Sequence, residues 1–251
     1  EIPLKSIFAI ILHKIGFPLL CVGDFTMEQE AIVWFIRLPR MLIGVLVGCS
    51  LGISGAVMQG IFSNPLADPG LIGVSAGATT GAVLSIVLGV TQFMPVFAFC
   101  GSALAVVLTI CLAIKNGKLS VLTLLLSGVA VGMLLGAFTS GLLVFLNSQR
   151  LSQYLFWMVG GLDYRTWEHV YLAVVPICLG IIFILALSRH LNILVLGDIE
   201  ARAVGMNVNF YGMILLFIAS LITAISVCVS GNIGFVGLVI PHIMRIIVGP
   251  D

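Results

Sequence analysis

Long stretches without any charged residue constrain this chain more than any other feature of its sequence. No Asp, Glu, Lys or Arg occurs at positions 41–67, 119–149 or 203–244, and only 8% of the 251 residues are charged. Soluble domains carry about 25% charged residues. Uninterrupted apolar runs of this length are typical of membrane-spanning segments. The sequence therefore predicts a polytopic membrane protein.

The same runs predict the architecture. About 20 apolar residues cross a hydrocarbon core of about 30 Å, so the chain has room for about seven helical spans. The runs are apolar on every face, which favours an all-α helical bundle, and no linker interrupts the single domain expected over residues 1–251. Residues 1–36 are expected to form an interfacial loop or the exit from an earlier helix, and Pro241 is expected to interrupt the last span. Breaks at Pro, Gly and polar residues place the spans at 38–62, 71–90, 96–114, 119–146, 170–187, 210–229 and 233–248.

The segment 147–168 differs from the spans on either side of it. It combines charged residues with aromatic side chains that have a polar tip, which suit the headgroup zone of a bilayer. The aromatic residues are Tyr154, Trp157, Tyr164 and Trp167.

Several functional classes are disfavoured. A net charge of +1 leaves no basic footprint for nucleic acid. The six cysteines form no CxxC pair, and His242 has no further ligands at metal-binding spacing, so we expect no metal site and no disulfide framework. An intramembrane enzyme would need a nucleophile–base pair or an HExxH motif, and no catalytic residue is predicted. A secondary, ion-coupled transporter remains the alternative, but it usually needs ionisable groups inside the membrane, which these spans lack. A purely structural scaffold is not excluded by chemistry.

Glycines recur every four residues in three of the predicted spans. This spacing gives one helix face without side chains, against which a neighbouring backbone can pack closely. The pattern fits either a compact core whose helices slide or rock, or plain structural packing. The three sets are Gly44, Gly48 and Gly52; Gly73, Gly77 and Gly81; and Gly128, Gly132 and Gly136.

Five local motifs, in three regions of the chain, resemble one family when their order and spacing are taken together. RLPR at 37–40 precedes the first span, which ends in GAVMQ at 55–59 and is followed by NPLADPG at 64–70 and GVSAGA at 73–78. GNIGFVGLVIPHIMR stands at 231–245. Over nearly all of its length the chain resembles the permease subunit of type II ABC importers, the iron-siderophore, haem and vitamin B12 permease family.

The resemblance implies a topology. Family permeases have ten transmembrane helices, and this chain resembles the second to the eighth, so the first helix and the last two are expected to be absent. The 11 Lys and Arg residues divide six to five between the two sides, which is too even to orient the chain. The resemblance implies that Arg37 and Arg40 face outward and that the loops 64–70 and 189–209 lie in the cytoplasm. It also implies the cytoplasmic (inner) membrane of a bacterium or archaeon.

The resemblance also implies an assembly. The chain has no Gly-x-x-x-x-Gly-Lys motif, so ATP with Mg²⁺ is expected to be hydrolysed by a separate ATP-binding subunit, and no cofactor is expected on this chain. The other implied partners are an extracytoplasmic substrate-binding protein, a second permease copy and membrane lipid. The implied substrate is a metal chelate of the siderophore, haem or cobalamin type.

Arg37 and Arg40 are the candidate docking residues. One helical turn would put both on the same face, where their guanidinium groups could pair bidentately with carboxylates of a partner. The alternative is that two long cationic side chains snorkel to the interface. The resemblance implies docking of the substrate-binding protein.

The loop 194–205 has the pattern of a short capped helix. Asp198 suits the N-cap, Glu200 the first turn and Gly205 the C′ position. The alternative is an inert interfacial helix, whereas the resemblance implies the coupling helix that meets the ATPase. The coupling residues it implies are Gly197, Asp198, Glu200, Ala201, Arg202 and Gly205.

The end of the first span supplies candidate gate residues. Polar groups such as Gln59 and Asn64 must hydrogen-bond within the bundle or line a wet pathway, and both possibilities stay open. The resemblance implies a pathway and gate, and extends the gate to the start of the fourth span, which is more apolar here than in vitamin B12 permeases. The gate residues are therefore Met58, Gln59, Asn64, Pro65, Val121 and Leu122.

Overall fold

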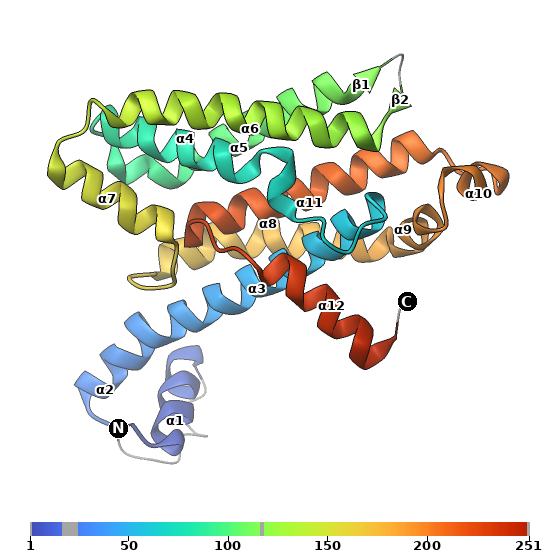
Figure 1. The fold of residues 1–251 in the computed structure, drawn as a ribbon. Helices are drawn as coiled ribbons and strands as arrows, with labels where there is room; N and C mark the ends of the chain where they lie inside the picture. Colours follow the sequence, from blue (N-terminus) through green and yellow to red (C-terminus); the bar gives the residue numbers. More distant parts are fainter. Residues whose placement is uncertain (1, 17–24, 116–117, 250–251) are drawn as a thin grey trace.

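A computed structural model describes the protein over residues 2–16, 25–115 and 118–249, and almost all of it is helical (Figure 1). In the described residues, five helical stretches are long and apolar enough to cross a membrane. Two shorter apolar helices complete the set. The five long stretches and the two shorter helices overlap the predicted spans, and the predicted all-α helical bundle is confirmed. The five long stretches are Met27–Ile61, Thr91–Ala113, Val121–Leu143, Trp167–Ala186 and Val208–Ser230, and the two short ones are Val74–Val87 and Val236–Val248.

The elements follow one another with short connections. An antiparallel hairpin, whose strands β1 and β2 have two residues each, joins α5 to α6. The elements in chain order are α1 (Leu4–Ile15), α2 (Met27–Ala31), the π-helical segment η2 (Ile32–Arg37), α3 (Leu38–Ile61), the 3₁₀ turn η3 (Pro69–Ile72), α4 (Val74–Val87), η4 (Thr91–Phe93), α5 (Met94–Ala113), β1 (Ile114–Lys115), β2 (Lys118–Leu119), α6 (Val121–Leu143), α7 (Ser148–Val159), α8 (Trp167–Ala186), α9 (Ser188–Val195), α10 (Asp198–Ala203), α11 (Val208–Ser230) and α12 (Val236–Val248).

The first long helix begins earlier than predicted. It starts at Met27 rather than at residue 38, so the expected interfacial loop is wrong for residues 27–36. A capping box sets its start, because the Thr26 hydroxyl accepts from the Gln29 backbone N–H and the Gln29 side chain accepts from the Thr26 N–H, both at 3.2 Å. Glu28 and Arg37 of this stretch are exposed, and the partly buried Glu30 forms an ion pair with Lys14 of α1 at 2.5 Å.

Two other boundaries also differ from the prediction. The predicted span 71–90 contains a helix only from Val74 to Val87, because η3 occupies Pro69–Ile72 and Gly73, at φ 86°, separates the two. The predicted interruption at Pro241 is wrong, since α12 continues through this proline. Pro241 cannot donate to the carbonyl of Gly237, and the Gln59 side chain donates to that carbonyl instead, at 3.4 Å.

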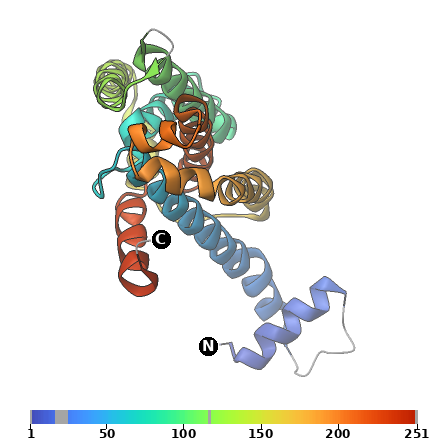
Figure 2. The same ribbon diagram turned by 90° about the vertical axis from the view of Figure 1, so that its right-hand side faces the viewer.

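The helices run between two ends of the bundle. In Figure 1, α9, α10 and the hairpin lie at one end, here called the α10 end, and α2 and α7 lie at the other, here called the α7 end. α4, α5 and α6 pack together, and α11 joins them to α3 and α8. Figure 2 shows α1 lying apart from the main body of the bundle, and α12 packing against α3 at its start and projecting from the bundle toward its end.

Buried serines bond α3 to α11 at the centre of the bundle. The Ser50 hydroxyl donates to the Ile222 carbonyl at 3.0 Å, and the Ser226 hydroxyl donates to Ser50 at 2.7 Å. The Ser54 hydroxyl donates to the Ala219 carbonyl at 3.1 Å. Lipid gives no hydrophobic drive for helix association, so such bonds and close packing hold the helices together.

The regularly spaced glycines lie in close backbone contacts on α4 but in open space at two positions on α6. On α4, Gly77 and Gly81 lie directly against the α5 backbone, where an added Cβ would collide with the carbonyls of Gly101 and Phe97. The predicted close backbone packing is therefore confirmed for these positions. On α6, a Cβ added at Gly132 or Gly136 would meet no described atom within 4 Å.

We predict that Gly55→Ala destabilises the protein. An added Cβ at Gly55 would collide with the backbone carbonyl of Gly237 where α3 crosses α12, and overpacking of this kind costs about 1–3 kcal/mol. Gly48→Ala on the same helix is the control, because open space surrounds it and alanine is favoured over glycine in a helix by about 0.5–1 kcal/mol. Denaturant titration in detergent should show opposite shifts for the two variants. Equal shifts would contradict the close contact.

Candidate functional site

The predicted coupling loop contains two short helices, α9 and α10. The N-cap of α10 is Gly197 and not Asp198, whose side chain makes no capping hydrogen bond, so that part of the prediction is wrong. Gly197 has φ 119°, and a Cβ added there would lie 2.7 Å from Oε2 of Glu200. Glycine suits this position because other residues rarely adopt that backbone angle.

The other end of α10 matches the prediction. Gly205 has φ 80°, and its N–H donates to the Arg202 carbonyl at 2.9 Å. The N–H of Met206 donates to the Ala201 carbonyl at 3.0 Å. This pair of bonds is the Schellman motif, so Gly205 occupies the C′ position.

The surface of α10 combines acidic and apolar side chains. Ala201 is buried against the bundle, and Ile199 is 80% exposed. Asp198 and Arg202 are exposed and lie 4.0 Å apart one turn from each other, and Glu200 is exposed beside them. A short helix that ends in a Schellman motif and presents an apolar residue among charges is suited to contact with another protein.

A cavity of about 440 Å³ lies between α10 and the start of α6. Asp198 and Arg202 line it from the predicted coupling loop, and Val121 and Leu122 line it from the predicted gate. Ser120 caps α6 at this point through its side chain. The structure thus brings together two groups of residues that the sequence leaves about 75 positions apart.

The remaining predicted gate residues lie in two environments. Asn64 and Pro65 are exposed in the turn after α3, where Oδ1 of Asn64 accepts from the Leu66 N–H at 2.9 Å. Met58 is fully buried, and Gln59 is 3% exposed. These four residues do not line the cavity beside α10, although Ile61 of the same helix does.

Gln59 lies at the centre of an interhelical hydrogen-bond network. Its amide donates to the carbonyls of Gly237 and Leu238, both at 3.4 Å, and its Oε1 accepts from Nη1 of Arg245 at 2.5 Å. From the sequence, Gln59 could either form an interhelical hydrogen bond or line a wet pathway. The structure shows the interhelical hydrogen bonds. The role of Gln59 in gating stays a prediction.

Arg245 is a residue of this site that the sequence reasoning missed. It lies in the last turn of α12, and its partner Gln59 is 186 positions away in the chain. Two features of the sequence indicate an interaction here. A lone Arg in an apolar run needs a polar partner, and the carbonyl four residues before Pro241 needs a donor that the proline cannot supply. Nothing local in the sequence identifies that partner as Gln59.

The arginine pair lies at the α7 end of the first long helix. Arg37 ends the π-helical segment η2, and Arg40 is in the first turn of α3; both are exposed. Nη1 of Arg40 forms a salt bridge with Oδ1 of Asp163 at 2.8 Å. Arg37 forms no salt bridge with any residue that the structure describes. Nearby, the Trp167 indole donates to the Trp34 carbonyl at 2.9 Å and fixes α8 against η2.

Over its whole length, residues 1–251, the chain matches the FecCD transport family. The chain belongs to the FecCD transport family. It is 45% identical over 225 residues to the cobalamin import system permease protein BtuC of Halobacterium salinarum, covering 88% of this chain and 60% of the relative. It is 41% identical over 256 residues to the vitamin B12 import system permease protein BtuC of Citrobacter koseri, covering 97% and 76%.

A solved structure also resembles this FecCD chain. It is described as an inward-facing conformation of a metal-chelate type ABC transporter. The match has a TM-score of 0.85 and 32% sequence identity, and covers 98% of this chain and 80% of the other. The resemblance inferred from the motifs is therefore confirmed at the level of family and fold.

Metal-ligating residues do not gather in the part of the FecCD chain that the structure describes. No group of three or more His, Cys, Asp or Glu residues is placed to hold an ion there. His242 is exposed on α12. The five described cysteines are free, and Cys21 lies outside the described residues.

We predict that Gln59 and Arg245 are energetically coupled. In a double-mutant cycle of Gln59→Leu and Arg245→Met, the coupling should be about 1–3 kcal/mol, because either change leaves a buried or charged group without its partner. The matched cycle combines Gln59→Leu with Arg40→Met at the far end of α3, and its effects should add within about 0.5 kcal/mol. Unfolding free energies in detergent give both values. Additivity in the first cycle would contradict the network.

Proposed function

We propose that this chain is the transmembrane permease subunit of an ATP-binding cassette importer. In this role α10 contacts an ATP-binding subunit in the cytoplasm, which hydrolyses ATP. The α7 end faces outward, and Arg37 and Arg40 receive an extracytoplasmic binding protein. A second permease copy completes the translocation path, and the assembly lies in the cytoplasmic membrane of a bacterium or archaeon.

The observation that carries the proposal is the cavity between α10 and the start of α6. Its two walls hold Asp198 and Arg202 on one side and Val121 and Leu122 on the other. A cavity can change volume when one wall moves, whereas a packed interface resists deformation. A partner can therefore displace α10 relative to α6 without breaking the core between α3 and α11.

The proposed substrate is a bulky metal chelate, with cobalamin first among the candidates. The support comes from the two permease relatives that are named for cobalamin and vitamin B12 import. Siderophore and haem complexes belong to the same proposed class. No described atom lies close to Gly132 and Gly136 on α6. The neighbouring side chains Met133 and Leu134 are apolar and exposed. An apolar surface of this kind suits a wide translocation path that binds its substrate weakly.

We predict that Glu200→Ala combined with Gly205→Val uncouples ATP hydrolysis from transport. Valine at φ 80° strains the end of α10, and the loss of Glu200 removes a charge from its exposed surface. Transport by the reconstituted complex should fall about tenfold, the effect of losing about 1.4 kcal/mol of interaction, while the basal ATPase rate persists. Glu28→Ala, at the far end of the bundle, is the control. Normal transport by the double variant would remove the coupling assignment.

We predict that Arg37→Glu combined with Arg40→Glu weakens docking of the binding protein. Reversed charges would face the partner's carboxylates, and we expect at least about tenfold weaker binding in nanodiscs, with assembly of the ATPase unchanged. Asp163→Asn is the matched control. It releases Arg40 from its 2.8 Å salt bridge and should bind no more weakly than the unaltered protein. Unchanged affinity in the double variant would show that these arginines do not dock the partner.

A further inference from the structure

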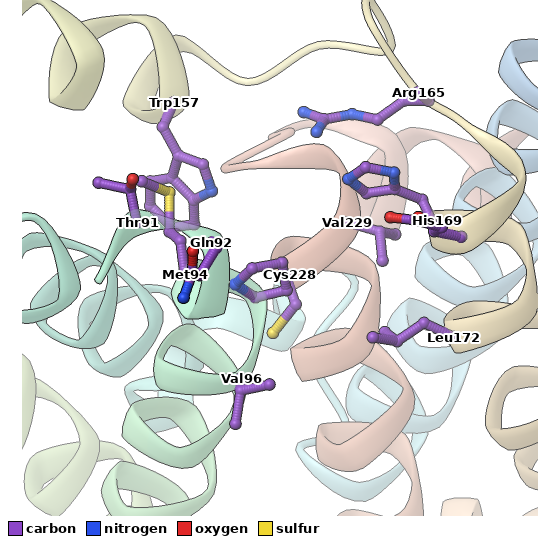
Figure 3. Close-up of a pocket in the computed structure, with 12 residues that line it drawn as sticks. Thr91, Gln92, Met94, Val96, Trp157, Arg165, His169, Leu172, Cys228 and Val229 are labelled. Atoms are coloured by element: carbon purple, nitrogen blue, oxygen red, sulfur yellow. The ribbon is translucent and has the colours of Figure 1, made fainter. Parts of the chain in front are cut away.

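A second cavity, of about 320 Å³, opens at the α7 end of the bundle (Figure 3). It lies where α5 and α8 begin and where α7 and α11 end, so it sits at the ends of three candidate spans. That position corresponds to the boundary between hydrocarbon and water. None of the predicted docking, coupling or gate residues lines it.

Arg165 supplies a positive charge to this cavity. In Figure 3 its guanidinium group points into the space above α11. Nη2 donates to the Gly161 carbonyl at 3.3 Å, whereas Nε is buried and has no hydrogen-bond partner among the described residues. Burial lowers the pKa of Arg165, an effect that the nearby charge of Asp163 partly offsets. A buried donor without an acceptor is costly. Arg165 also lines the cavity, so a ligand oxygen can approach its guanidinium group from there.

Glu168 supplies a negative charge to the same cavity. It lines the cavity from the first turn of α8 and forms no salt bridge with Arg165 or with any other described residue. The neighbouring His169 ring is already engaged through Nδ1, which lies 3.0 Å from the Thr166 hydroxyl. The cavity therefore presents one cation and one anion that form no salt bridge with each other. A ligand that carries both charges would match them.

The part of the cavity that lies below Arg165 in Figure 3 is lined by apolar side chains. Met94 and Val96 line it from α5, Leu172 from α8 and Val229 from α11. The exposed faces of α5 and α8 below it remain apolar, with Leu104 and Val175 more than half exposed. Trp157, across from Arg165 in Figure 3, has the amphipathic character of a headgroup-zone aromatic. A polar mouth above an apolar wall favours an amphipathic ligand.

We propose that this cavity binds the headgroup of a phosphoethanolamine lipid, with the phosphate on Arg165 and the ammonium on Glu168. Two alternatives fit less well. A purely anionic headgroup would bring its charge close to the Glu168 carboxylate. A phosphocholine headgroup has a trimethylated nitrogen without N–H donors, so it cannot hydrogen-bond to that carboxylate, whereas a primary ammonium can.

Native mass spectrometry of the purified protein, titrated with single lipids of matched acyl chains, tests the proposal. We expect phosphatidylethanolamine to bind about tenfold more tightly than phosphatidylcholine, the difference that one charge-assisted hydrogen bond supplies. Arg165→Gln should weaken phosphatidylethanolamine binding about tenfold on the same grounds. Arg150→Gln is the matched control, since Arg150 is exposed on α7 and lies outside the cavity. It should leave the binding unchanged.

Glu168→Gln separates the lipid classes. It should remove the preference for phosphatidylethanolamine over phosphatidylcholine and improve binding of phosphatidylglycerol, because the repelling carboxylate is gone. Inorganic phosphate at millimolar concentration should not displace the lipid. Displacement by phosphate would reveal a simple anion site, and an unchanged preference in Glu168→Gln would overturn the proposed pairing. If Arg165→Gln does not fold, Arg165→Lys keeps the charge, and equal lipid binding by a folded Lys variant and by the unaltered protein would overturn the role of the Arg165 fork. The test requires only folded protein, so its outcome is independent of transport.

Discussion

The close contact of backbone with backbone between helices is the constraint on which this structure depends. In lipid, apolar side chains gain nothing by leaving the solvent for each other, so helices associate through close packing and internal hydrogen bonds. The carbonyl of Gly237 shows both effects at one atom. It lies against the bare face of α3 at Gly55 and accepts from the Gln59 side chain in place of the donor that Pro241 lacks. This arrangement fixes the start of α12 against α3.

The fold was largely predictable because lipid imposes a simple rule on sequence. Apolar runs long enough to span fold as helices, so the all-helical bundle followed from where charges are missing. The boundaries were less predictable for local reasons. The Thr26–Gln29 capping box is present in the sequence, but the charged residues after it suggested a loop. Pro241 suggested a break in the last helix. The helix continues because Gln59, far away in the chain, donates the hydrogen bond that the proline cannot.

The candidate site was predictable in its parts and not in its assembly. The glycine at the end of α10 was identified from its position after a short helical pattern, and Gly205 does occupy C′. The cavity that joins Asp198 to Leu122 depends on how α6, α10 and α11 pack, which no local pattern contains. The same holds for Arg245 and Gln59 and for the cavity at Arg165, where each residue is ordinary by itself and the arrangement becomes informative only in three dimensions.

The centre of the bundle is closely packed, whereas the α10 end contains a cavity between two helices. Serine bonds and glycine contacts fix α3, α4, α5 and α11 in the middle, whereas α10 and the start of α6 face each other across open space. The most direct test is the distance between spin labels at positions 122 and 202, measured by pulsed electron resonance in the complex with the ATP-binding subunit. We expect the distance distribution to shift when ATP is added, while a control pair at positions 48 and 217 on α3 and α11 stays unchanged. An ATP-dependent transport cycle with no shift between 122 and 202 would contradict the proposed displacement of α10 relative to α6.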